Sequence, residues 1–297
     1  MTRNSISKIG LGTSMLFNGR LRSNIDDFQR EVLFKKIINN GINLIHTNAN
    51  LGTQERVCKL LTRFNKQVFH ITKLESDIVS LLKKDRTQFT GRLKNTKQNC
   101  PLYLPFAVCI EVDHHREAAY LDNKLALVQW VEIAAMSIFD ELGYKPKIIL
   151  MCKSPTEFRV AIESKHIDYI GGYTNILQSG LLMEIFRNNS NKPIIGFSPF
   201  SRGRIFTIKG KNYIVKKLIE KKMLGNFEIY KTNINELIKE ISFKIALSCP
   251  NIVSLITGIY SFQSLEWVQT KINFIPYDSK FCIDILRAVS RDKYDWN

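Results

Sequence analysis

Two titratable side chains stand at the ends of short apolar runs in this 297-residue chain. His46 lies near the end of the run 42–47, and Lys73 closes the run 67–73. An imidazole with an unshifted pKa titrates near neutral pH and can give a proton to a reacting group. A lysine with an apolar neighbour and no nearby carboxylate tends toward the neutral amine, which attacks carbonyl carbons. The two residue types therefore indicate proton transfer or Schiff-base chemistry.

The run 106–112 ends in a third group of titratable residues, within the stretch EVDHHRE (111–117). Either His114 or His115 could donate a proton from this strand end. The stretch also contains the residue types that bind metals, but adjacent side chains in one loop point apart. Shared coordination by such neighbours is disfavoured, so we predict no metal site.

Apolar runs that alternate with amphipathic segments indicate the elements that hold these residues. Candidate strands cover 8–11, 42–47, 67–73, 106–112, 147–152, 168–172, 193–198 and 253–257. Helical spacing of apolar residues marks 26–39, 53–64, 123–142, 156–164, 181–188 and 235–247. Strands that alternate with helices form parallel sheets. Eight such strands without an evident linker favour a (β/α)8 TIM barrel, of the α/β class, over a doubly wound open sheet.

A barrel of this size accounts for residues 1–297 as a single domain. In such barrels the pocket lies at the carboxyl ends of the strands. His46, Lys73 and Glu111 would then face one mouth although they are far apart in the sequence. The fold therefore predicts one site at that end of the barrel.

The cysteines and the apolar content indicate where the chain resides. The six cysteines are widely spaced and include no C-x-x-C pair: Cys58, Cys100, Cys109, Cys152, Cys249 and Cys282. That usage is typical of reduced thiols, and not of a disulfide framework or a zinc cluster. Residues 1–17 contain no continuous apolar segment, and no run of about 18 apolar residues occurs elsewhere. We therefore predict a cytoplasmic protein without a membrane partner.

Basic residues outnumber acidic ones by 43 to 27, which gives a formal net charge of +16. The densest basic segment is 209–222, KGKNYIVKKLIEKK, whose lysines fall on the outer face of a predicted amphipathic helix. Its predicted apolar side consists of Ile214, Val215, Leu218 and Ile219. Aromatic residues do not alternate with these lysines as they do in surfaces that stack bases. We therefore predict no specific nucleic-acid partner.

Five stretches, in this order, resemble the successive signatures of the aldo-keto reductase superfamily. They are KIGLGTSML (8–16), NNGINLIHTNANLGTQERVCKLL (39–61), FHITK (69–73), IIGFSPFSRGRI (194–205) and LSCPNIVSLITGIYSFQSLEW (247–267). The resemblance implies a barrel that reduces a small-molecule carbonyl substrate with NAD(P)H.

The family uses a tyrosine to donate the proton, a lysine and an aspartate to lower its pKa, and a histidine to orient the carbonyl. The resemblance places the lysine at Lys73, the aspartate at His46 and the tyrosine at Leu51. The histidine position falls among Glu111, Asp113, His114 and His115. A leucine has no proton to donate, and without the aspartate no ion pair holds Lys73 charged beside a phenol. The family reaction is therefore expected to be weakened or rerouted.

The leading expectation is a divergent oxidoreductase that acts on a small carbonyl or hydroxyl compound. Its proton donor would be His46 or a histidine after the fourth strand. Two alternatives stay open. The barrel is a pseudoenzyme that serves as a binding or scaffold protein, or Lys73 supports non-redox lyase or isomerase chemistry.

The cofactor positions also depart from the family pattern. The resemblance assigns cofactor contacts to Phe197, Ser198, Arg202, Ser154, Gly258 and Tyr260. Phe197 matches the aromatic residue that stacks on the nicotinamide. Ser154 keeps one polar group for the carboxamide, whereas the arginine that would pair with the 2′-phosphate of NADP is absent. An NAD(P)H site that is weakened or lost is therefore expected.

Overall fold

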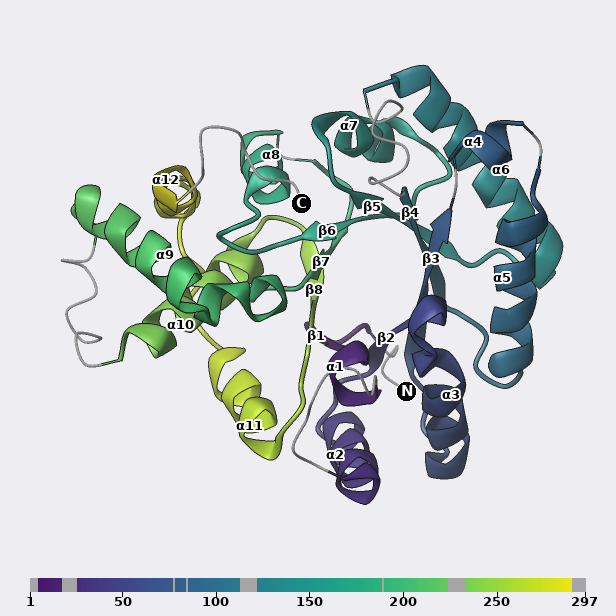
Figure 1. Ribbon diagram of the computed structural model, residues 1–297, viewed down its shortest axis with the longest axis horizontal. Coiled ribbons are helices and arrows are strands. Elements are labelled where there is room, and N and C mark those ends of the chain that lie inside the picture. Colours follow the sequence, from purple (N-terminus) through teal and green to yellow (C-terminus); the bar gives the residue numbers. More distant parts are fainter. Residues whose placement is uncertain are drawn as a thin grey trace.

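The computed structural model describes residues 5–17, 26–76, 78–83, 85–112, 122–188, 190–223 and 233–289. Within them, eight parallel strands close into one barrel in their order along the chain (Figure 1). The strands are β1 (Ile9–Gly12), β2 (Leu44–Asn48), β3 (Phe69–Ser76), β4 (Ala107–Val112), β5 (Lys147–Cys152), β6 (Tyr169–Tyr173), β7 (Ile194–Phe197) and β8 (Ile252–Thr257). The ring closes because β8 pairs with β1 as well as with β7. The predicted (β/α)8 barrel is confirmed.

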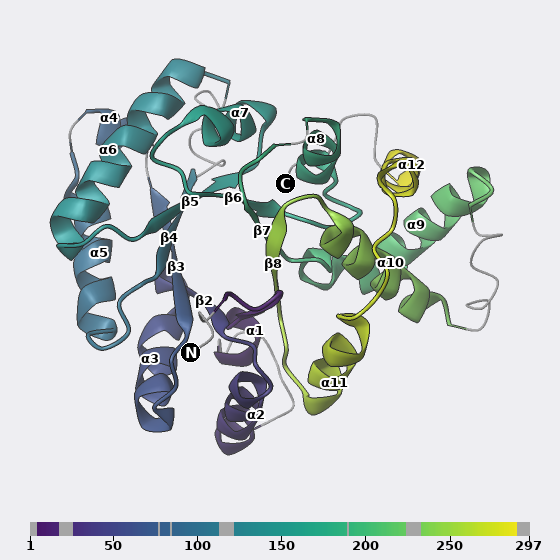
Figure 2. The same ribbon diagram turned by 180° about the vertical axis from the view of Figure 1, so that it is seen from behind.

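Helices surround the barrel on its outside, as two opposite views show (Figure 1, Figure 2). They are α1 (Ser14–Phe17), α2 (Asp27–Asn39), α3 (Thr53–Phe64), α4 (Ile78–Leu82), α5 (Thr87–Asn99), α6 (Lys124–Leu142), α7 (Pro155–Glu163), α8 (Gly180–Asn188), α9 (Ile208–Glu220), α10 (Ile234–Ser248), α11 (Phe262–Lys271) and α12 (Ser279–Val289). The 3-10 segments η1 (Ala49–Leu51) and η3 (Ser201–Phe206) follow β2 and β7. Asp26, Asn123 and Asn233 each accept a backbone N–H and so fix the starts of α2, α6 and α10.

Apolar side chains are buried on both faces of the strands. One cluster fills the barrel interior and contains Leu44, Ile71, Ala107, Cys109, Ile149, Met151, Ile195, Phe197 and Ile256. Larger clusters outside the barrel join the strands to the helices. Parallel strands that are covered on both faces read as continuous apolar runs, which is the pattern seen in the sequence. The interior is therefore a packed core, and a site can form only at its ends.

The amphipathic helix predicted in 209–222 is α9. Ile214 and Leu218 are buried as predicted, whereas Ile219 is 58% exposed. Successive helix residues are about 100° apart, so the residue after Leu218 turns away from the core. The apolar side of α9 is therefore narrower than predicted. Within the described ranges, no helix is both long and apolar enough to cross a lipid bilayer.

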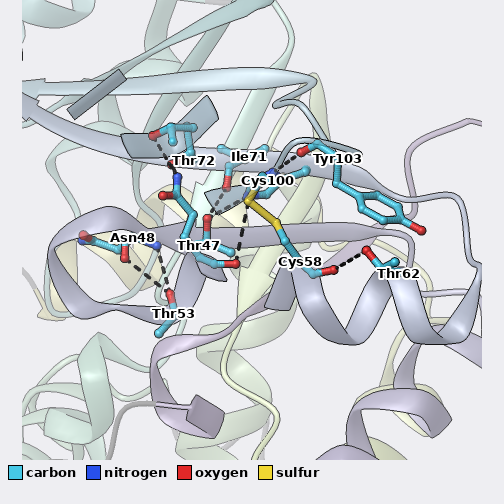
Figure 3. Close-up of a disulfide and its surroundings, with 12 residues drawn as sticks. Thr47, Asn48, Thr53, Cys58, Thr62, Ile71, Thr72, Cys100 and Tyr103 are labelled. Atoms are coloured by element: carbon cyan, nitrogen blue, oxygen red, sulfur yellow. Dashed lines mark hydrogen bonds between the residues drawn. A yellow bond between two sulfur atoms is a disulfide. The ribbon is translucent and has the colours of Figure 1, made fainter. Parts of the chain in front are cut away.

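Two of the six cysteines form a disulfide, which corrects the prediction that all are reduced thiols. Cys58 in α3 and Cys100, at the carboxyl end of α5, are joined with their Cα atoms 5.4 Å apart (Figure 3). The pair is 42 positions apart in the sequence. Only the packing of α3 beside α5 brings the side chains within bonding reach, which spacing cannot show. Cys109, Cys152, Cys249 and Cys282 are free and buried. The cysteine argument for a cytoplasmic location thus loses its basis.

Candidate active site

The carboxylate of Glu111 lies between two lysines at the carboxyl ends of the strands. Glu111 is on β4 and is only 3% exposed. Its Oε2 pairs with Lys73 Nζ, and its Oε1 pairs with Lys153 Nζ. β4 lies between β3, which carries Lys73, and β5, which ends one residue before Lys153. Three neighbouring strand ends thus bring together one glutamate and two lysines, which we call the Lys73–Glu111–Lys153 triad.

Burial favours the uncharged form of both lysines. It lowers the pKa of Lys73 to about 8, and the positive charge of Lys153 also lowers it. The pKa of Lys153 is lowered too, chiefly by burial. The Glu111 carboxylate, in contact with both ammonium groups, opposes this effect and stabilises their charged forms. Lys73 is therefore mostly protonated at neutral pH but can exchange its proton close to that pH.

His46 lies on β2, close enough to Lys73 for their charges to interact. Burial, more than the charge of Lys73, lowers the pKa of His46 to about 3. Its ring packs edge-on against Phe197, with the ring centroids 5.1 Å apart. Its Nε2 is enclosed and makes no hydrogen bond to any residue that the structure describes. The imidazole is thus neutral at neutral pH.

Leu51 lies in η1, directly after β2, where the family pattern has a tyrosine. The β2–β3 register pairs Asn48 with Lys73, so η1 begins immediately beyond the level of the lysine. Leu51 is 37% exposed. An aliphatic side chain at this position supplies neither a proton nor a hydrogen bond to a substrate oxygen.

Tyr173 and Arg202 lie beside the triad. Tyr173 ends β6, and its hydroxyl accepts a 2.8 Å hydrogen bond from Arg202 Nη2. The guanidinium carbon of Arg202 also lies 5.6 Å from the centre of the Tyr173 ring, as in a cation–π contact. The charge of Arg202 acts on both Lys73 and Lys153. Three basic side chains thus lie at this end of the barrel: Lys73 on β3, Lys153 after β5 and Arg202 after β7.

Left-handed backbone angles shape the loop that presents Arg202. Ser198, Ser201 and Arg202 have φ angles of 52°, 48° and 53°, each of which costs a non-glycine residue roughly 1 kcal/mol. Gln178 Oε1 accepts hydrogen bonds from Asn175 Nδ2 at 2.9 Å and from Ser201 Oγ at 3.0 Å. Asn175 Nδ2 also donates to the Ser198 carbonyl at 3.1 Å. The neighbouring side chains therefore hold the loop in its strained form.

The residues assigned to the cofactor match only part of an NAD(P)H molecule. Arg202 and Tyr260 are exposed, Tyr260 by 45%, so they suit contacts with phosphate and with an adenine ring. Phe197 is 5% exposed and has no open ring face for a nicotinamide. Ser154 accepts the Glu157 backbone N–H at 3.1 Å as the N-cap of α7, and its hydroxyl can still donate one hydrogen bond. The Phe197 position thus does not fit a nicotinamide in this state.

Three other residues were assigned to the site from the sequence: Gly258, His114 and His115. Gly258 follows β8, and a Cβ added there would lie 3.1 Å from Met15 Cγ, while its assignment to the cofactor stays a prediction. His114 and His115 lie outside the described residues. Lys153 and Tyr173 were not predicted as site residues. Both stand at strand ends of the predicted barrel, so a systematic inspection of those positions would have found them.

Comparison with solved structures shows the fold of the aldo-keto reductases. A thermostable aldo-keto reductase, Tm1743, matches with a TM-score of 0.63 and 18% identity over 94% of this chain and 95% of that one. The holo form of aldo-keto reductase AKR11C1 from Bacillus halodurans matches with a TM-score of 0.66 and 10% identity, over 98% and 95%. Glycerol dehydrogenase AKR11B4 from Gluconobacter oxydans matches with a TM-score of 0.65 and 14% identity, over 95% of this chain and 92% of that one. No protein-family model and no curated protein sequence matches the chain.

The chain is therefore a (β/α)8 barrel with the fold of the aldo-keto reductases, as its sequence motifs predicted. At 10–18% identity this likeness establishes the fold alone. The site itself departs from the family pattern at His46 and Leu51, so the reaction has to be argued from the residues present.

Proposed function

We propose that this chain is an oxidoreductase of the aldo-keto reductase kind, which acts on a small carbonyl or hydroxyl compound at the barrel mouth. The observation that carries the proposal is the Lys73–Glu111–Lys153 triad at the strand ends, where enzymes with this fold bind their substrates. Desolvating three charged groups opposes folding, and perturbed titratable groups concentrate at functional sites. Substrate binding and proton transfer therefore explain the triad better than stability does.

Lys73 is the proposed proton donor in place of the missing tyrosine. Its pKa of about 8 lies near the pH of most cells, where a general acid is most effective. His46, with a pKa of about 3, carries no proton to spare at that pH. Lys73 thus replaces His46 as the expected donor.

In this class of enzymes a nicotinamide cofactor supplies the hydride. Arg202 and Tyr260 support binding of its phosphates and adenine ring, whereas Phe197 would have to change its contacts to receive the nicotinamide. We therefore propose a weakened site for NAD(P)H.

The first experiment is a titration of the purified chain with NADPH and NADH, read as the melting temperature. A nucleotide at about ten times its dissociation constant adds about 1.4 kcal/mol of stability, or roughly 2–5 °C. A panel of small aldehydes and ketones then measures turnover with whichever nucleotide binds. Lys73→Met should lower kcat by about 10²–10⁴-fold and leave the nucleotide-induced shift in place.

The control variant is Lys94→Met, which removes an exposed lysine of α5 away from the site and should leave kcat unchanged. If neither nucleotide shifts the melting temperature at millimolar concentration, the oxidoreductase proposal fails.

A gain of function tests the missing acid directly. His46→Asp together with Leu51→Tyr restores the residue types of the family pattern next to Lys73. If the nucleotide binds and only the acid is lacking, this double variant should reduce aldehydes faster than the unmodified chain. The single variant Leu51→Phe, which adds the ring without the hydroxyl, should give no such increase.

A binding or scaffold protein without redox catalysis is the second candidate. It is favoured by the burial of Phe197, whose ring has no open face for a nicotinamide. Absence of a nucleotide effect, with no turnover by the double variant, would select this candidate.

A further inference from the structure

We propose that the Lys73 amine forms imines with small aldehydes or ketones, and that Lys153 promotes this reaction because it shares the Glu111 carboxylate. The activity needs no cofactor, so it goes beyond the proposed oxidoreductase function and does not depend on it.

The charge of the triad provides the first argument. One carboxylate contacts two ammonium groups, so the fully protonated triad carries a net positive charge in a buried place. Loss of one proton makes the triad neutral, which a low-dielectric environment favours. The carboxylate then stays paired with the remaining ammonium group. A neutral lysine amine thus forms at a small cost, without leaving Glu111 unpaired.

Lys73 is the lysine that loses this proton. It lies within β3, whereas Lys153 lies beyond the end of β5. Burial lowers the pKa of Lys73 to about 8, and a lysine next to a second cation is a known type of activated amine. The other groups whose charges act on Lys73 or Lys153, or lie beside them, are His46 on β2, Glu75 on β3, Cys109 on β4, Tyr173 on β6, Glu157 on α7 and Arg202 in η3.

The proton balance of the reaction closes with the solvent. The Lys73 ammonium loses one proton to water while Glu111 stays paired with Lys153, and the neutral amine forms a bond to the carbonyl carbon. The carbonyl electron pair moves to oxygen, which receives a proton from the attacking nitrogen. The resulting hydroxyl takes one proton from the solvent, the C–O bond breaks, and water leaves. A protonated imine on Lys73 and one water molecule are the products, and no oxidant or reductant is consumed.

The test is reductive trapping with glycolaldehyde and sodium cyanoborohydride, without nucleotide, followed by peptide mapping. At neutral pH a lysine with a pKa of about 8 contains on the order of 100-fold more neutral amine than an exposed lysine with a pKa of about 10.4. Lys73 should therefore be labelled about 100-fold faster than the exposed Lys94 in the same digest. The pH midpoint of Lys73 labelling should lie near 8.

Variants at Lys153 separate its role from a merely structural one. Lys153→Met leaves Lys73 as the only cation on Glu111, so labelling of Lys73 at neutral pH should fall at least about tenfold and its midpoint should rise. Lys153→Arg keeps the charge and should keep most of the labelling. Circular dichroism checks that both variants are folded.

Labelling of Lys73 no faster than that of Lys94 in the unmodified chain would overturn the proposal, whatever the variants do. An unchanged midpoint in folded Lys153→Met would overturn the role of Lys153. Because trapping is done without nucleotide, its failure is distinguishable from failure of the oxidoreductase proposal, which the nucleotide titration decides.

Discussion

Burial shifts the pKa of His46, His70 and Lys73 in the same direction, but their partners differ. His70 is fully enclosed, its Nδ1 lies 3.1 Å from the Tyr103 carbonyl, and its Nε2 lies 2.8 Å from the Thr47 hydroxyl. Both of its nitrogens are therefore engaged, as in a structural residue. The Nε2 of His46 has no partner among the described residues, and Lys73 is held by a carboxylate that it can exchange for a ligand.

The pKa of His70 predicts that the fold loses stability in mild acid. Burial lowers this pKa to about 4, against about 6.5 in an unfolded chain. Between these two pH values the unfolded chain binds the extra proton, so the free energy of unfolding falls as the pH drops from about 6.5 towards 4. His70 alone should contribute a loss of about 2 kcal/mol between pH 7 and pH 5.

Urea unfolding at pH 7 and pH 5 measures this loss, with His70→Gln as the comparison. The variant keeps an amide that can donate to the Tyr103 carbonyl but does not titrate. Its difference in stability between the two pH values should be smaller by about 2 kcal/mol. An equal difference in both chains would show that His70 does not lose its proton on folding.

The sequence predicted which side chains lie at the strand ends better than it predicted their protonation. Lys73 and Glu111 were expected there because residues at the carboxyl ends of barrel strands face one mouth. The protonation of His46 could not be predicted, since it depends on how completely neighbouring strands enclose the ring. Lys153 was missed because the family comparison directed attention to Ser154, whose oxygen instead caps α7.

At the scale of elements, strand positions were predicted closely and strand ends less so. The run 67–73 became β3 (Phe69–Ser76), because its pairing with β4 continues as far as Ser76 opposite Val112. Such an extension depends on the partner strand and leaves no mark in the local apolar pattern. The disulfide between α3 and α5 is a second case, since it depends on the arrangement of two helices around the barrel.

Glycine in β6 illustrates a packing constraint that can be tested. A Cβ at Gly172 would overlap with Leu181 Cδ2 of α8 and lie 3.1 Å from the Cys152 carbonyl oxygen of β5. Gly172→Ala should therefore destabilise the fold by about 1–3 kcal/mol. Gly91 in α5 is a matched control because nothing lies within 4 Å of its added Cβ. Gly91→Ala should stabilise by about 0.5–1 kcal/mol. Urea unfolding measures both, and equal effects of the same sign would contradict the packing argument.

The disulfide should contribute to stability by closing a loop between α3 and α5. Its cysteines are 42 positions apart, a separation for which restriction of the unfolded chain gives about 2–4 kcal/mol. Reduction of the purified chain should lower the free energy of unfolding by this amount. The control is Cys58→Ala with Cys100→Ala, whose stability should not respond to the reductant. If the stability of the unmodified chain does not respond to the reductant, and Cys58 and Cys100 titrate as free thiols after unfolding, the two cysteines are not joined.

At the scale of the whole molecule, closure of the ring explains why residues far apart in the sequence share one site. The triad comes from β3, β4 and the end of β5, and Arg202 follows β7. A doubly wound open sheet built from the same apolar runs would not have joined β8 to β1. Fold class was predictable because the number and order of the runs allow few arrangements. The net charge of +16 follows from the composition alone, whatever the fold.

That charge predicts weak, sequence-independent binding to polyanions. Lys209, Lys221 and Lys222 of the basic segment are exposed at the two ends of α9. Contact with about four phosphates gives a slope of log K against log salt of about −3.6, so affinity should fall about 10³-fold between 20 and 150 mM salt. Fluorescence anisotropy with DNA duplexes of two unrelated sequences measures the affinity at each salt concentration. Replacing the three lysines with glutamine should weaken binding more than the same change at the exposed Lys66, Lys94 and Lys97. Tight binding at 150 mM salt with a preference for one duplex would instead establish a specific nucleic-acid partner.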